Sequence, residues 1–124
     1  MLLDTSAWIE YLKGTNLGGE IKSLSEKTSF YTCPLTFAEI TNWVYKNNEG
    51  PEPHLQKIKN LSKILELNED ILVNSGKTYY RERKNNEKIS MIDCIIYTTA
   101  RYHDLILLTK DNDFKDLPYV RILE

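Results

Sequence analysis

The chain has 124 residues, of which 41% are hydrophobic and 27% charged, and its formal net charge at pH 7 is −2. A chain of this length builds one core, so we expect a single domain over residues 1–124. The composition is that of a globular domain and excludes a disordered or fibrous protein. No apolar run reaches the roughly 20 residues of a membrane span, and the N-terminus lacks the pattern of a signal peptide. We therefore expect a cytoplasmic protein with no membrane contact.

Short apolar runs alternate with stretches of helical periodicity along the whole chain. Expected helices have apolar residues every three or four positions, and expected strands are short runs rich in aromatic and β-branched residues. The expected elements, in chain order, are strand 1–4, helix 5–14, helix 17–27, strand 29–34, helix 35–48, helix 53–61, strand 63–68, helix 69–85, helix 90–103, strand 105–109, a short helical segment at 113–118 and strand 119–123.

This alternation predicts a three-layer α/β/α sandwich with a central parallel sheet of about five strands, because parallel strands need crossover helices. In the helix at 90–103, the residues expected to face the interior are Ile92, Ile95, Ile96 and Ala100. Function in open sheets of this kind gathers beyond the carboxyl ends of the strands. The acidic residues at those positions are therefore the first candidates for a site.

Four acids follow or flank the expected strands. Asp4 ends the first strand, Glu39 lies early in the helix after the second, Asp93 opens the helix before the fourth, and Asp111 follows the fourth. Each also suits a structural role. The segments "TFAE" (36–39) and "SMID" (90–93) match the capping box of a helix start, and aspartate is common at N-caps and turns.

For any one of these acids alone, capping is the commoner role, but the four together favour a metal site. Carboxylates gathered at one strand edge repel one another and raise each other's pKa unless a cation neutralises them. A set of oxygen ligands without histidine or thiolate suits Mg²⁺ or Mn²⁺, which also bind substrate phosphates. Cys33 and Cys94 lie far apart in the sequence and are expected to be buried thiols.

Several segments together resemble a PIN-domain ribonuclease of the VapC-like toxin group. They are "LLDTSAWIEYLKG", the glutamate in "PLTFAEI" and "SMIDCIIYTTARYHDLILLTKDNDF", in an order and spacing that cover nearly the whole chain. The resemblance implies a five-stranded parallel sheet and cleavage of RNA with Mg²⁺ or Mn²⁺. Members of this family are frequently homodimers, and toxin members bind a small antitoxin, so the resemblance also implies these two partners.

The same resemblance assigns roles to individual residues. It implies that four acids hold the metal: Asp4, Glu39, Asp93 and Asp111. Asp113 stands where many members have a further acid, and Ser6 matches the small hydroxyl residue of the first motif. The chain departs from the family in the short connection before the helix of Glu39. One of the acids, or Asp113 from outside the metal's ligands, would act as general base toward a metal-activated water.

A basic segment precedes the helix that contains Asp93. Apart from the five candidate site acids, the chain has 13 acidic and 16 basic residues, so the remaining surface is mildly basic. In "YYRERKNNEK" (79–88) four basic residues are candidates for phosphate contacts: Arg81, Arg83, Lys84 and Lys88. Tyr79 and Tyr80 are able to stack on bases, but packing within the protein is the commoner role and is expected for both.

Two other functional classes compete with a nuclease. A receiver-type regulatory domain also clusters acids at strand ends, but it needs a phosphate-accepting aspartate at the end of its central strand. The runs "SFYTCP" and "KILELN" offer none. A non-catalytic PIN-like scaffold would bind RNA or a partner without cutting. Metal-dependent turnover separates both alternatives from the ribonuclease.

Overall fold

Five parallel strands form the central sheet of the protein, which is described here over residues 1–124 by a computed structural model. The strands are β1 (Leu2–Leu3), β2 (Phe30–Thr32), β3 (Ser62–Ile64), β4 (Leu107–Thr109) and β5 (Val120–Ile122). Their order across the sheet is β3-β2-β1-β4-β5, and Leu2 of β1 pairs with Tyr31 on one side and Leu107 on the other. The expected number and direction of strands are confirmed.

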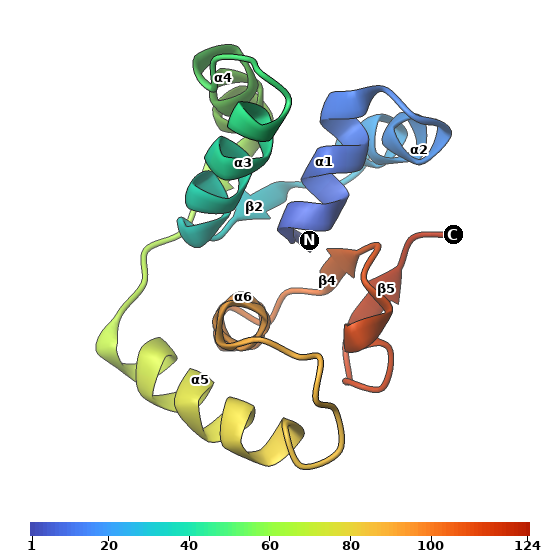
Figure 1. The fold of residues 1–124 in the computed structure, drawn as a ribbon. Helices are drawn as coiled ribbons and strands as arrows, with labels where there is room; N and C mark the ends of the chain where they lie inside the picture. The colour runs from blue at the N-terminus through green and yellow to red at the C-terminus, as the bar shows by residue number, and fades with distance from the viewer.

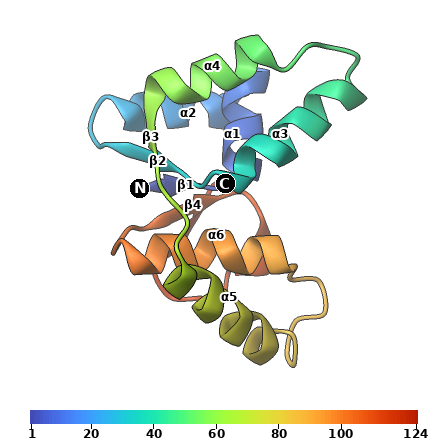
Figure 2. The same cartoon turned by 90° about the vertical axis from the view of Figure 1, so that its left-hand side faces the viewer.

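Helices cover both faces of the sheet, so the predicted three-layer sandwich is also confirmed. One layer contains α1 (Thr5–Lys13), α2 (Asn16–Ser25), α3 (Leu35–Lys46) and α4 (Glu52–Leu61), and the other contains α5 (Glu69–Glu82) and α6 (Met91–Tyr102). Figures 1 and 2 show these two groups of helices on opposite sides of the strands. A short 3₁₀ helix, η1 (Asn112–Phe114), connects β4 to β5. None of the helices combines the length and apolar character needed to span a membrane.

The two faces of the sheet support separate hydrophobic cores. Alternate strand residues point to opposite faces, so Leu3 packs with the core beneath α1–α4, whereas Leu2 packs with the core beneath α6. Trp8 is fully buried in the first core and Phe114 of η1 in the second. Because both faces are covered, the central strand β1 and the neighbouring β4 are fully buried, whereas the edge strands β3 and β5 each contain an exposed charged residue, Lys63 and Arg121.

Local signals explain how the first helices begin and end. The Asp4 side chain caps α1, and Gly14 ends it with a left-handed backbone (φ 71°), a conformation that glycine adopts at little cost. The helix α2 then packs closely across α1. A Cβ atom added at Gly18 would overlap the backbone carbonyl oxygen of Glu10, so only glycine fits at this crossing.

Two expectations about side-chain burial are wrong. Ile92 is 39% exposed, because it lies in the first turn of α6 at the end of the sheet, whereas Ile96 and Ala100 are buried as predicted. Tyr80 was expected to pack within the protein and is 70% exposed. The helix α5 buries Ile71, Ser75 and Thr78 instead, which places Tyr80 on the opposite, outer side.

The two cysteines and the two matches to the capping box have different outcomes. Cys33 and Cys94 are free and buried, as predicted. The box at Ser90 and Asp93 forms, with each side chain bonded to the other residue's backbone N–H. The one at "TFAE" does not form, because α3 already begins at Leu35 and has no side-chain cap. Glu39 therefore has no capping role.

Candidate functional site

The candidate site lies where β1 and β4 end side by side. The chain leaves β1 into α1 on one face of the sheet, whereas η1, which follows β4, packs into the core on the other face. A crevice at the carboxyl ends of neighbouring strands whose connections diverge is the usual ligand site of open α/β sheets. Asp4 directly follows β1, and Asp111 is the second residue after β4.

Asp4 is a buried carboxylate with every oxygen hydrogen-bonded. Its Oδ1 accepts from the Ala7 backbone N–H (3.0 Å) and from the Ser6 hydroxyl (2.7 Å), and its Oδ2 accepts from the Thr109 hydroxyl. Only 4% of the residue is exposed. Burial raises the pKa of Asp4 to about 6, and the nearby charge of Asp111 adds to the rise against the opposing hydrogen bonds. Asp4 therefore caps a helix and is also costly to ionise.

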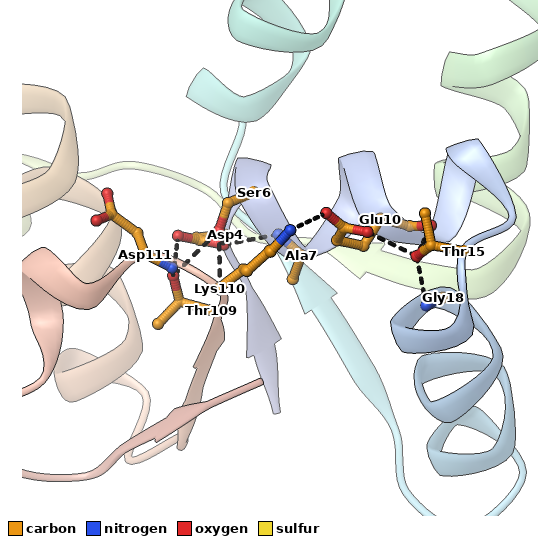
Figure 3. Close-up of polar contacts among 9 residues, drawn as sticks. All are labelled: Asp4, Ser6, Ala7, Glu10, Thr15, Gly18, Thr109, Lys110 and Asp111. Atoms are coloured by element: carbon orange, nitrogen blue, oxygen red, sulfur yellow. Dashed lines mark hydrogen bonds and ion pairs between the residues drawn. The ribbon is translucent and has the colours of Figure 1, made fainter. Parts of the chain in front are cut away.

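Two hydroxyl groups join α1 to the turn after β4. The Ser6 hydroxyl accepts from the Lys110 backbone N–H (2.9 Å) and lies 3.1 Å from the Thr109 hydroxyl, which in turn accepts from the Asp111 backbone N–H (2.9 Å). Figure 3 shows this network around Asp4, with the Asp111 carboxylate directed away from it. Ser6 and Thr109 thus fix the backbone on which Asp111 stands.

An ion pair extends the network along α1 (Figure 3). The Lys110 ammonium lies 2.7 Å from the Glu10 carboxylate, which also accepts from the Thr15 hydroxyl at 2.6 Å. Glu10 is only 5% exposed, and the hydrogen bonds from Lys110 and then Thr15 lower the pKa of Glu10. This pair could not be predicted from the sequence, because no periodicity or motif connects two residues 100 positions apart.

Asp93 and Asp111 retain helix-capping bonds at this edge. Asp93 accepts from the Ser90 backbone N–H (3.0 Å), and Asp111 accepts from the Asp113 backbone N–H (2.9 Å). Burial raises the pKa of Asp93, and the charges of Asp111 and Asp113 raise it further. These three acids are therefore near enough to act on one another electrostatically, as Asp4 and Asp111 are.

Glu39 lies beside this group rather than within it. The half-buried Glu39 carboxylate accepts from the hydroxyl of Thr5, the residue after Asp4, at 2.5 Å. The Thr5 hydroxyl also lies 3.2 Å from that of Thr36 on the same helix as Glu39. Thr5, which directly follows Asp4 in the chain and is hydrogen-bonded to Glu39, thus connects the two acids.

The donor chemistry of these acids fits a hard divalent cation, although their side chains do not already converge. No group of three or more His, Cys, Asp or Glu side chains stands close enough together to bind an ion. The acids offer only oxygen ligands, which Mg²⁺ and Mn²⁺ prefer. The raised pKa values of Asp4 and Asp93 show carboxylates that a nearby cation would help to ionise.

The basic residues before α6 divide into separate groups. Arg81 lines a groove between α5 and α6 together with Arg101. Arg83 and Lys84 directly follow α5 and line a separate surface pocket, and Lys88 lies in the loop before α6. The Asn86 side-chain amide in this loop donates to the Asp113 carbonyl oxygen at 3.1 Å, which joins the loop to the turn that follows Asp111.

The sheet order and the acids at the β1/β4 edge define a three-layer α/β domain with a carboxylate-lined strand edge. A sequence model of the PIN domain matches residues 1–119. The chain therefore belongs to the PIN domain family, which confirms the family resemblance inferred from the sequence. No curated protein gives a significant match to the chain.

Solved structures with the same fold include toxin–antitoxin proteins. A chain of a toxin–antitoxin complex from Klebsiella pneumoniae superposes with a TM-score of 0.78 at 24% identity, covering 99% of this chain and 97% of that one. A chain of VapBC2 from Rickettsia felis, bound to a DNA fragment from its promoter, gives 0.78 at 18% identity, with coverage of 99% and 96%. Mycobacterium tuberculosis VapC20, a sarcin–ricin loop cleaving toxin, gives 0.77 at 14% identity, with coverage of 99% and 98%.

Proposed function

We propose that the protein is a divalent-metal-dependent endoribonuclease and the toxin of a toxin–antitoxin pair. The observation that carries the proposal is the position of Asp4, Asp93 and Asp111 at one strand edge of a PIN domain, where burial chiefly, and to a smaller extent the charge of Asp111, raises the pKa of Asp4 and Asp93. Structural support comes from the similar fold of VapC20, which cleaves the sarcin–ricin loop. The site acts on the phosphodiester backbone of RNA.

Four side chains would hold Mg²⁺ or Mn²⁺: Asp4, Glu39, Asp93 and Asp111. When bound, such an ion lowers the pKa of a water molecule and neutralises charge that develops on the scissile phosphate. Asp113 would orient the attacking water, and the hydrogen bonds of its backbone to Asp111 and Asn86 support this role by fixing its position. Ser6 and Thr109 keep Asp4 in one orientation.

The proposed nuclease function also implies which molecules the protein binds. RNA would contact Ser6 and four basic residues near the end of α5: Arg81, Arg83, Lys84 and Lys88. A small antitoxin would bind the protein, as in the Klebsiella pneumoniae complex, and the protein would act in the cytoplasm as a homodimer. The alternative is a PIN scaffold that binds RNA or a partner without cleaving. A complete set of acids favours the enzyme, because a scaffold does not need it.

Cleavage of a single-stranded RNA by the purified protein tests the proposal. We expect cleavage with Mn²⁺ or Mg²⁺, none with EDTA, and none with Asp111→Asn purified in parallel, which controls for contaminating ribonuclease. Asn keeps the hydrogen-bond acceptor that caps η1 but removes the charge that a hard cation needs. Equal cleavage by a folded Asp111→Asn protein would refute the assignment, and RNA binding without metal-dependent cleavage would favour the scaffold.

A further inference from the structure

Two tyrosine–cation pairs lie side by side near the end of α5. The Arg83 guanidinium lies over the Tyr79 ring, 5.4 Å from its centroid, and donates to the Tyr79 hydroxyl at 2.8 Å. The Lys84 ammonium lies 4.4 Å from the centroid of the Tyr80 ring. Each pair joins a tyrosine in the last turn of α5 to a basic residue four positions later, just beyond the end of the helix. Each cation is thus held next to an aromatic ring.

These pairs surround an open surface pocket. It is lined by five residues: Tyr79, Tyr80, Arg83, Lys84 and Glu87. At 70% exposure, Tyr80 is the most exposed large hydrophobic side chain of the protein, whereas Tyr79 is half-buried and supports Arg83. A tyrosine of structural value would be expected to bury its ring. The exposed ring of Tyr80 is therefore available to a ligand.

The pocket lies at the end of the protein where the candidate site is. The helix α6 begins at the carboxyl edge of the sheet, and α5 ends one loop earlier, so the last turn of α5 is at the same end (Figure 2). The hydrogen bond from Asn86 to the Asp113 carbonyl oxygen connects that loop to the turn after Asp111. An extended strand of RNA crossing the acids would thus continue toward α5.

We propose that Tyr80, Arg83 and Lys84 form a subsite for an unpaired nucleotide of RNA. A base stacks on the face of the Tyr80 ring that Lys84 does not cover, and the flanking phosphates contact the Arg83 guanidinium and the Lys84 ammonium. Aromatic rings beside a basic groove are the usual means of binding single-stranded nucleic acid without sequence preference. This subsite rests on the proposed function, because it supplies the substrate contact of the same nuclease.

A protein partner is the competing occupant of this helix. Leu72 and Val73 are also exposed on α5, at 47% and 52%. They lie, however, toward its acidic N-terminal end, next to Glu69 and Asp70. At the other end, the two positive charges held over tyrosine rings match a polyanion and not an apolar partner surface. RNA is therefore the occupant that the chemistry of the pocket favours.

Binding of a labelled, unstructured RNA oligonucleotide in EDTA tests the subsite without cleavage. We expect Tyr80→Ala to weaken binding by about 5- to 100-fold and Tyr80→Phe to retain it, because stacking needs the ring. Tyr45→Ala is the matched control, since Tyr45 is 61% exposed on α3 in the other layer of helices. Arg83→Ala should reduce the slope of log affinity against log salt, whereas Tyr80→Ala should leave that slope unchanged.

The outcomes separate this inference from the proposed function. If the wild type cleaves RNA but Tyr80→Ala binds it as tightly as Tyr45→Ala does, the subsite is refuted and the nuclease stands. If the wild type binds RNA through Tyr80 but never cleaves it, the subsite stands and the nuclease is refuted. A change in sedimentation for Tyr80→Ala, with RNA affinity intact, would assign the pocket to protein association and overturn the inference.

Discussion

Replacing Asp4 with asparagine should stabilise the metal-free protein at neutral pH and abolish the proposed metal-dependent cleavage of RNA. Burial raises the pKa of Asp4 from 3.8 to about 6, so the native state resists ionisation of this group. A pKa difference of this size corresponds to about 3 kcal/mol of folding free energy once the carboxyl group is ionised. Asparagine avoids that cost because it carries no charge.

The hydrogen bonds around Asp4 can accommodate the amide. An asparagine Oδ1 would keep the bonds from the Ala7 N–H and the Ser6 hydroxyl. Its Nδ2 would donate to the Thr109 oxygen, whose proton would turn to the Ser6 hydroxyl 3.1 Å away. Every polar atom then retains a partner. We therefore expect a gain of about 1 to 3 kcal/mol at pH 7, the upper figure being the full cost of ionisation.

The sign and the pH range follow from linkage. Between about pH 4 and pH 6 the native state binds more protons at Asp4 than the unfolded state, so ionisation of Asp4 lowers stability as pH rises through this range. The difference in free energy of unfolding between Asp4→Asn and the wild type should be small at pH 3.5, grow up to about pH 6.5 and stay constant above it. Urea unfolding in EDTA at several pH values measures this difference. A variant less stable than the wild type at pH 7, or a difference independent of pH, would refute the reasoning.

Three further predictions concern the site and its support. Millimolar Mn²⁺ should raise the melting temperature of the wild type, because it binds only the native state, but not that of Asp4→Asn; equal shifts in both would argue against a metal at this edge. Asp111→Asn should nearly abolish RNA cleavage in a turnover assay and Asp113→Asn should only reduce it; the reverse order would exchange their roles. Lys110→Met should lower the free energy of unfolding, measured in urea, by about 1 to 2 kcal/mol, because it leaves the Glu10 carboxylate buried without its ion-pair partner. Lys115 is an exposed lysine on the same segment, and Lys115→Met should change that free energy little. A Lys110→Met protein as stable as Lys115→Met would show that the ion pair adds nothing to the fold.

The strand ends that contribute to the candidate site could be predicted from the sequence better than its side-chain contacts. The run "LLD" places Asp4 at a strand end, and "LLTKD" does the same for Asp111, because a short apolar run followed by a polar residue marks where a buried strand ends. The contact between Thr109 and Asp4 depends on the parallel register of β1 and β4. That register joins residues more than 100 positions apart, and no local pattern contains it.

The outer side of α5 was mispredicted for a related reason. Hydrophobic periodicity assigns tyrosines to the interior, but the inward side of this helix contains Ser75 and Thr78, two small polar residues that let α5 pack against α6. A pattern based on apolar residues does not detect such a face. The exposed position of Tyr80, and with it the proposed RNA subsite, became evident only from the packing of the two helices.

The strand order also determines when the site can form during synthesis. The first two strands end at Thr32, yet they occupy the middle of the sheet, between β3 on one side and β4 and β5 on the other. Because translation releases the N-terminus first, Asp4 is exposed long before Asp93 and Asp111 have been made. A nascent chain therefore lacks two of the four candidate acids, Asp93 and Asp111, long after Asp4 and Glu39 have been made. The proposed metal site can therefore assemble only after the segment that contains Asp111 has been made.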